Sequence, residues 1–186
     1  MTPLAILIML TLSATAAEQT VQYSVRGLFQ PDRKDALTNA ATALENCRLI
    51  EVNFDLARAT FGYDDEAQGF KKAKPEQILQ QIDNQVRSAT NHTFTLQQPR
   101  ALAEDKLKRI EFTIEGLDCL GCSYGAYSTV VAIEGVERAT ASFHDGRLTA
   151  FIDPAKTNRE AVAEVLKKKD IKIVEATDKQ EPKPKN

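Results

Sequence analysis

The sequence contains no tryptophan, and its other aromatic and soft side chains are few. Its 186 residues include three cysteines, two histidines and two methionines, and aromatic residues make up 6%. Stacking platforms for nucleic-acid bases are hard to build from so few rings. Two histidines leave little room for acid–base catalysis, and three cysteines are too few for a disulfide-dense scaffold.

An excess of charge of one sign is also lacking. The chain has 24 basic and 26 acidic residues, for a formal net charge of −2. A binding partner of the nucleic-acid class would require a basic face, which this balance does not provide. At 42% hydrophobic and 27% charged residues the composition is that of a globular protein. We find no nucleotide-binding loop or carboxylate constellation, and we predict that the protein is not an enzyme.

The N-terminus has the pattern of an export signal. Residues Pro3–Leu12 are apolar, and Ala14–Ala16 offers small residues for cleavage. We expect residues 1–17 to be removed and the protein to be periplasmic or secreted. A membrane-spanning helix needs about 20 apolar residues, so we expect no membrane insertion after cleavage. An uncleaved N-terminal anchor is the alternative.

An internal repeat organises the rest of the chain. Residues 20–65 align with residues 109–154 without a gap, and the apolar pattern agrees better than the identities do. Each copy predicts a strand, a helix and two further strands from its periodicity. The positions that carry this pattern in the first copy are Val21, Tyr23 and Val25, then Leu37, Ala40, Ala41 and Leu44, then Ile50, Val52 and Phe54, then Ala59, Phe61 and Tyr63.

Each copy then continues into a second helix and a closing strand. The second helices follow Pro75 and Asn158, and Asn158 is a good N-cap. The closing strands are expected around Phe94–Leu96 and Ile171–Val174. The order β-α-β-β-α-β therefore occurs twice and predicts an α+β protein of two tandem ferredoxin-like units. Each would be a four-stranded antiparallel sheet with two helices on one face.

These units suggest a division of the chain. We expect one domain over residues 18–97, a polar linker over 98–107 and a second domain over 108–177. The charged, proline-containing tail 178–186 is predicted to be disordered.

A pair of cysteines lies at the first strand–helix junction of the second unit, in the stretch Gly116-Leu117-Asp118-Cys119-Leu120-Gly121-Cys122. Two intervening residues let both sulfurs point at one atom. The N-terminus of the helix favours thiolate over thiol, and thiolates select soft ions. Two such ligands suit near-linear Cu(I) or Hg(II), whereas zinc normally takes four.

The loop resembles that of the heavy-metal-associated domain family, which runs Gly-Met-x-Cys-x-x-Cys. The resemblance extends to the V-A-I-E-G-V stretch Val131–Val136 and to Asp153-Pro154, and it covers residues 108–176. It implies that Cys119 and Cys122 bind a metal ion, Cu(I) foremost with Hg(II) and Zn(II) as alternatives. It also implies transfer of that ion to or from a metal-transporting or metal-receiving protein. The family's Met is Leu117 here, and its variable position after the second helix falls at about Ile171.

Other interpretations of the pair stay open. Outside the cytosol neighbouring cysteines tend to oxidise. The pair would then be an inert disulfide, or the centre of a thiol–disulfide redox protein. The fold could also serve as an interaction module in which the pair has no role.

The first unit lacks the pair. Gln30 and Arg33 occupy the positions of Cys119 and Cys122, although Asp32 could still cap the helix that follows Pro31. This unit is interpreted as a metal-free, degenerate copy that serves as spacer, stabiliser or docking surface.

Three further side chains are candidates for a metal site. Cys47 is expected to be a small buried hydrophobe, with a third thiolate ligand or a disulfide as alternatives. His92 and His144 are expected in solvated loops, with an auxiliary ligand role conceivable for His144.

Overall fold

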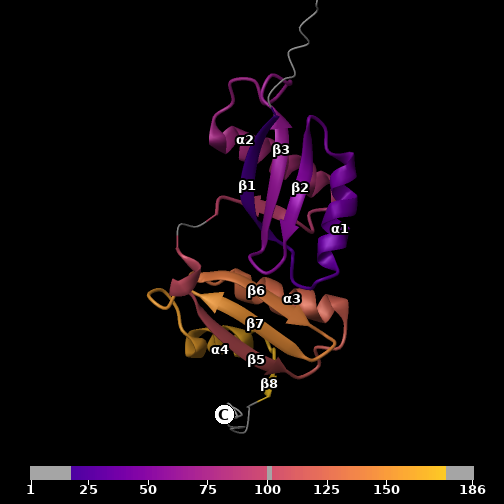
Figure 1. Ribbon diagram of the computed structural model, residues 1–186. Helices are drawn as coiled ribbons and strands as arrows, with labels where there is room; N and C mark the ends of the chain where they lie inside the picture. The colour runs from indigo at the N-terminus through magenta and orange to yellow at the C-terminus, as the bar shows by residue number, and fades with distance from the viewer. Residues whose placement is uncertain (1–17, 100–101, 175–186) are drawn as a thin grey trace, which may run out of the picture.

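The computed structural model describes residues 18–99 and 102–174, which form two four-stranded sheets, each with its own helices (Figure 1). The predicted signal 1–17 and tail 178–186 lie outside the described residues. No helix in the described part of the chain has the length and apolarity needed to cross a bilayer.

The first unit follows the predicted order of elements. These are β1 (Glu18–Arg26), α1 (Arg33–Ala40), β2 (Cys47–Asn53), β3 (Arg58–Asp64), α2 (Pro75–Ala89) and β4 (Thr95–Gln97). A short 3₁₀ turn, Ala41–Ala43, extends α1, and the strands are ordered β2-β3-β1-β4.

The second unit repeats the same order. Its elements are β5 (Lys108–Ile114), α3 (Leu120–Val131), β6 (Val136–Ser142), β7 (Arg147–Ile152), α4 (Arg159–Lys168) and β8 (Ile173–Val174). The sheet order β6-β7-β5-β8 matches that of the first unit, and every pairing is antiparallel. Both units have the ferredoxin-like fold.

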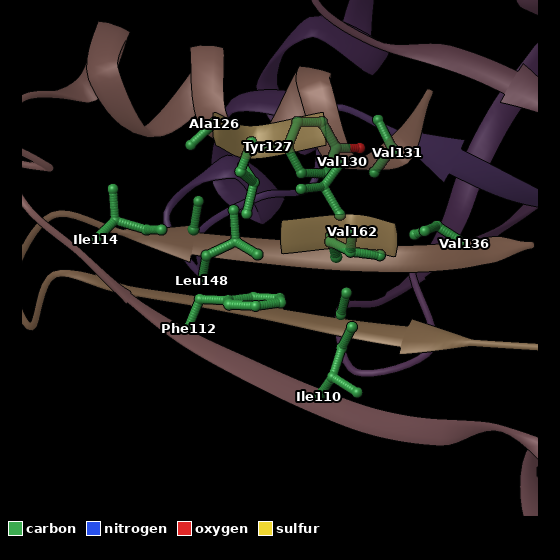
Figure 2. Close-up of a cluster of buried hydrophobic side chains, with 14 of the residues drawn as sticks. Ile110, Phe112, Ile114, Ala126, Tyr127, Val130, Val131, Val136, Leu148 and Val162 are labelled. Atoms are coloured by element: carbon green, nitrogen blue, oxygen red, sulfur yellow. The ribbon is translucent and has the colours of Figure 1, made fainter. Parts of the chain in front are cut away.

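The core of the second unit lies between its sheet and its helices. Figure 2 shows Ala126 and Val130 of α3 on the side of the helix that faces Phe112 of β5 and Leu148 of β7, and Tyr127 of α3 belongs to the same core. All five residues are at most 5% exposed. Because α3 packs on the sheet along this face, the helix start that carries the cysteine pair is held against the end of β5.

Two details of the first unit differ from the sequence prediction. Ile50 was expected to share a buried face with Val52, but it is 43% exposed. The pairing of β2 with β3 shifts between Leu49 and Glu51, and a bulge of one residue turns Ile50 outward.

The first helix is also shorter than predicted. It ends at Ala40, and Leu44 is extended instead of helical. The hydroxyls of Thr38 and Thr42 donate to the carbonyls of Lys34 and Asn39, a bond that competes with regular helix geometry. Only Leu37 is buried in α1, so little apolar packing favours a longer helix.

Candidate metal centre

The cysteine pair occupies the junction between β5 and α3. Gly116 has a φ of +72°, which favours glycine and turns the chain out of β5. Cys119 is the N-cap of α3, and its Sγ accepts a hydrogen bond from the backbone N–H of Cys122, at 3.0 Å. A sulfur thus takes the place of the oxygen that usually caps a helix. The positive end of the helix dipole would stabilise negative charge on the sulfurs once the pair is reduced.

The two sulfurs are joined as a disulfide, with 5.1 Å between the two Cα atoms. Cys119 is exposed and Cys122 is partly buried. The pair is therefore open to a reductant or to another protein's thiolate. Reduction would leave both sulfurs on one side of the helix start, where they can approach a common atom.

A carboxylate that the sequence analysis missed joins the pair. Asp118 is exposed, and its Oδ1 lies 3.4 Å from the Sγ of Cys122. Ligand atoms of Asp118, Cys119 and Cys122 all lie within 4.8 Å of one another. Its place next to Cys119 was the available signal. Cys122 lies about one helical turn after Asp118, so its sulfur comes close to the Asp118 carboxylate.

Apolar side chains support the loop from below. Leu117 is 5% exposed and belongs to the core of the second unit. A cavity of about 390 Å³ beside the loop is lined by Leu117, Cys122, Lys169 and Ile171, among others. The segment after α4 therefore lies near the pair, as the family resemblance implied for Ile171, and it brings the basic Lys169 to the same groove.

The remaining candidates lie elsewhere. Cys47 is 9% exposed within the core of the first unit, and burial raises the pKa of its thiol to about 11. His92 is exposed and accepts a hydrogen bond from Arg87. His144 is exposed, and its ring lies 4.2 Å from that of Phe143. Within residues 18–99 and 102–174, the one group of candidate ligands contains none of these three side chains.

The corresponding loop of the first unit has a different environment. Gln30, at the position of Cys119, is 3% exposed and donates from Nε2 to the carbonyl of Ala141 in β6, at 3.0 Å. Arg33, at the position of Cys122, pairs with Asp32 at 2.7 Å. The carboxylate of Asp32 makes no capping bond to α1, so the predicted N-cap was wrong. No ligand geometry survives here.

Comparison with known proteins gives only distant structural relatives. No family model matches the chain, and no curated protein matches its sequence. The chain is similar to oxidised MerP from Ralstonia metallidurans CH34, with 16% identity, a TM-score of 0.35 and coverage of 37% of this chain and 94% of that one. It is also similar to the water-soluble region of the P-type ATPase CopA from Bacillus subtilis, with 15% identity, a TM-score of 0.35 and coverage of 89% and 99%.

A third solved structure is a putative copper-ion-binding protein from Bacillus anthracis str. Ames, with 19% identity, a TM-score of 0.35 and coverage of 37% of this chain and 96% of that one. The likeness is one of fold.

Proposed function

We propose that the protein binds a soft metal ion through Cys119 and Cys122 in their reduced state, and captures it or passes it to another protein. The observation that carries this proposal is the position of both sulfurs at the exposed start of α3. Two thiolates suit a near-linear Cu(I) ion, which we take as the foremost cargo. Hg(II) is the alternative with the same geometry.

Asp118 bears on the choice of metal. A carboxylate oxygen is a harder ligand than a thiolate and suits a borderline ion such as Zn(II). Cu(I) would need only the two sulfurs, whereas Zn(II) would use Asp118 as a third ligand and water as a fourth. The same loop thus offers two ligand sets, and Asp118 distinguishes them.

The proposal includes export of the protein, from the apolar pattern of residues 1–17. In an oxidising compartment the pair needs a thiol donor before it can bind metal. Reduction adds two electrons and two protons to the disulfide, and the metal then displaces the thiol protons. The partner would be a metal-transporting or metal-receiving protein whose thiolates replace these ligands one at a time.

The disulfide between Cys119 and Cys122 favours a second candidate, a thiol–disulfide redox protein. In that case the pair would exchange electrons with a partner's dithiol, one disulfide breaking as the other forms. No metal would be required.

A Cu(I) titration of the reduced protein against a competing chromophoric chelator separates these candidates. A Cys119→Ser/Cys122→Ser variant is the comparison, and free thiols are counted before reduction. We expect one-to-one binding that the double variant loses. Binding no tighter than that of the variant would refute the metal proposal and favour the redox one.

A parallel Zn(II) titration tests the role of Asp118. We expect Asp118→Asn to weaken Zn(II) binding by about tenfold or more and to leave Cu(I) binding unchanged. The control is Glu115→Gln, an exposed carboxylate of the same loop that is not among the grouped ligand atoms. Equal loss of both metals in Asp118→Asn would mean that this residue acts on the loop and not on the metal.

A further inference from the structure

The loop Gly27–Gln30 of the first unit lies against the second unit, where β6 and α3 meet it (Figure 1). We propose that the first unit is an internal docking module. Its loop covers the edge strand β6 at Ala141 and packs on the helix that carries the cysteine pair, so that the two units act as one body. This inference does not depend on whether the pair binds metal.

The loop contacts the backbone of the edge strand β6. β6 is an edge strand of its sheet, and such a strand leaves backbone groups open to pairing with another chain. The N–H of Ala141 in β6 donates to the carbonyl of Phe29, at 2.9 Å. The carbonyl of Ala141 accepts from Nε2 of Gln30, at 3.0 Å. The loop thus satisfies both outward-facing backbone groups of Ala141, one with a backbone carbonyl and the other with a side-chain amide.

The loop also makes an aromatic contact with α3. Phe29 is 2% exposed and belongs to the hydrophobic core of the second unit, although it lies in the first unit's sequence. Its ring centroid lies 5.5 Å from that of Tyr124 and 5.5 Å from that of Tyr127. The hydroxyl of Tyr127 accepts a hydrogen bond from the N–H of Gly27, at 2.7 Å. Ring packing and this bond fix the loop on α3.

The two copies of the loop differ at the positions that make this contact. Phe29 and Gln30 align with Asp118 and Cys119. The first loop thus has a buried phenyl ring where the second has an exposed carboxylate, and a buried carboxamide where the second has an exposed sulfur. Phe29 and Gln30, which differ from Asp118 and Cys119, are the residues that make the contact. Only the first loop is suited to dock, and the second stays exposed.

The first unit also contains an uncovered counterpart of the docking strand. Val52 in β2 aligns with Ala141, and both precede the hairpin at the same place, since Val52 pairs with Ala59 and Ala141 with Leu148. Within the described ranges, the edge-facing side of Val52 makes no hydrogen bond. Equivalent positions on the two edge strands therefore differ: the docking loop covers Ala141 in β6, whereas Val52 in β2 has no such partner within the described residues.

Hydrogen exchange of these two amides, measured by NMR on the full protein, tests the proposal. We expect the Ala141 amide to exchange at least about tenfold more slowly than that of Val52. In a Phe29→Ala/Gln30→Ala variant, Ala141 should exchange as fast as Val52. Ala150, on the central strand β7, should stay protected in both proteins and so report that the second unit is folded. Ile50→Ala, at an exposed site on β2, is the control and should change neither rate.

Residual dipolar couplings of the unaltered protein provide a second measurement that needs no variant. One alignment tensor should describe both units if they form one body. Equal exchange of Ala141 and Val52 in the unaltered protein would overturn the proposal, and so would two independent tensors. If the double variant fails to fold, the comparisons in the unaltered protein still decide the question.

Discussion

The three cysteines differ in environment far more than in sequence context. Cys119 lies exposed at a helix start, whereas Cys47 packs in the core of the first unit, where its Sγ lies 4.0 Å from the side-chain oxygen of Gln85. Burial raises the pKa of the Cys47 thiol to about 11 because the thiolate would lose its solvation. The buried thiol is therefore inert at neutral pH, and chemistry is left to the exposed pair.

This difference predicts selective alkylation. After mild reduction at pH 8, iodoacetamide should modify Cys119 and Cys122 and spare Cys47. With a pKa of about 11 against an unperturbed 9.0, the thiolate fraction of Cys47 falls about 100-fold. Peptide mass spectrometry checks the sites, with the denatured protein as control. Rapid labelling of native Cys47 would contradict the burial described here.

The raised pKa of Cys47 also makes the free energy of unfolding depend on pH. The folded state raises the pKa of this thiol, so it favours the protonated form. Its stabilising contribution is complete below the unperturbed value of 9.0 and is lost as pH rises through about 11. The pKa of Tyr23, raised by burial to about 12, acts in the same direction at higher pH.

Among the elements, the helices α1 and α4 differ in how their N-termini are capped. Asn158 begins α4, and its Oδ1 accepts a hydrogen bond from the N–H of Ala161 at 2.8 Å. Asp32 precedes α1 in a helical conformation and makes no such bond. Both are residues that sequence rules favour as N-caps. The bond forms only where the backbone at the cap position is extended, as it is at Asn158.

We therefore predict unequal costs for two similar substitutions. Asn158→Ala should lower the free energy of unfolding by about 1 kcal/mol, because it leaves a helix donor without its partner. Asp32→Ala should change it by less than about 0.5 kcal/mol, since an ion pair at the surface contributes little. Urea unfolding of each variant measures the difference. Equal costs would show that Asp32 caps α1 in solution.

In the whole molecule the two units contact each other, which the order of strands within each sheet does not predict. Besides the docking loop, Glu104 lies 3.8 Å from Arg58 of the first unit and 2.7 Å from Arg138 of the second. Arg138 in turn stacks on Phe151, with its guanidinium carbon 3.8 Å from the ring centroid. Polar contacts thus accompany the apolar contact of Phe29. Through Glu104 the linking segment forms ion pairs with both units.

The position of Phe29 predicts a stability effect across the units. Phe29→Ala should destabilise the second unit by about 3 kcal/mol, because it leaves a cavity in that unit's core. The first unit should be affected less, although it contains the substitution. Residue-resolved hydrogen exchange in increasing urea distinguishes the two units. A larger effect on the first unit than on the second would contradict this assignment.

The repeat, the order of elements and the position of the cysteine pair could all be predicted from the amino-acid sequence. Periodicity of apolar residues is a local property, and it predicts which residues enter a sheet or a helix face. Local rules were less reliable where packing decides. The bulge that exposes Ile50 belongs to the pairing of β2 with β3, and the helical backbone at Asp32 removes the geometry of a cap, so the spacing of apolar and capping residues predicts neither.

The contacts of the loop Gly27–Gln30 could not be predicted in this way, because they depend on how the two units pack together. Phe29 and Gln30 look like degenerate positions when they are compared with Asp118 and Cys119 alone. Their partners lie more than ninety residues away, in α3 and β6. The hydrogen bond from Gln30 to Ala141 spans 111 residues, and the bond from Gly27 of the same loop to Tyr127 spans 100. The hydrophobic effect has no direction, so no local pattern shows which core will bury a given phenyl ring.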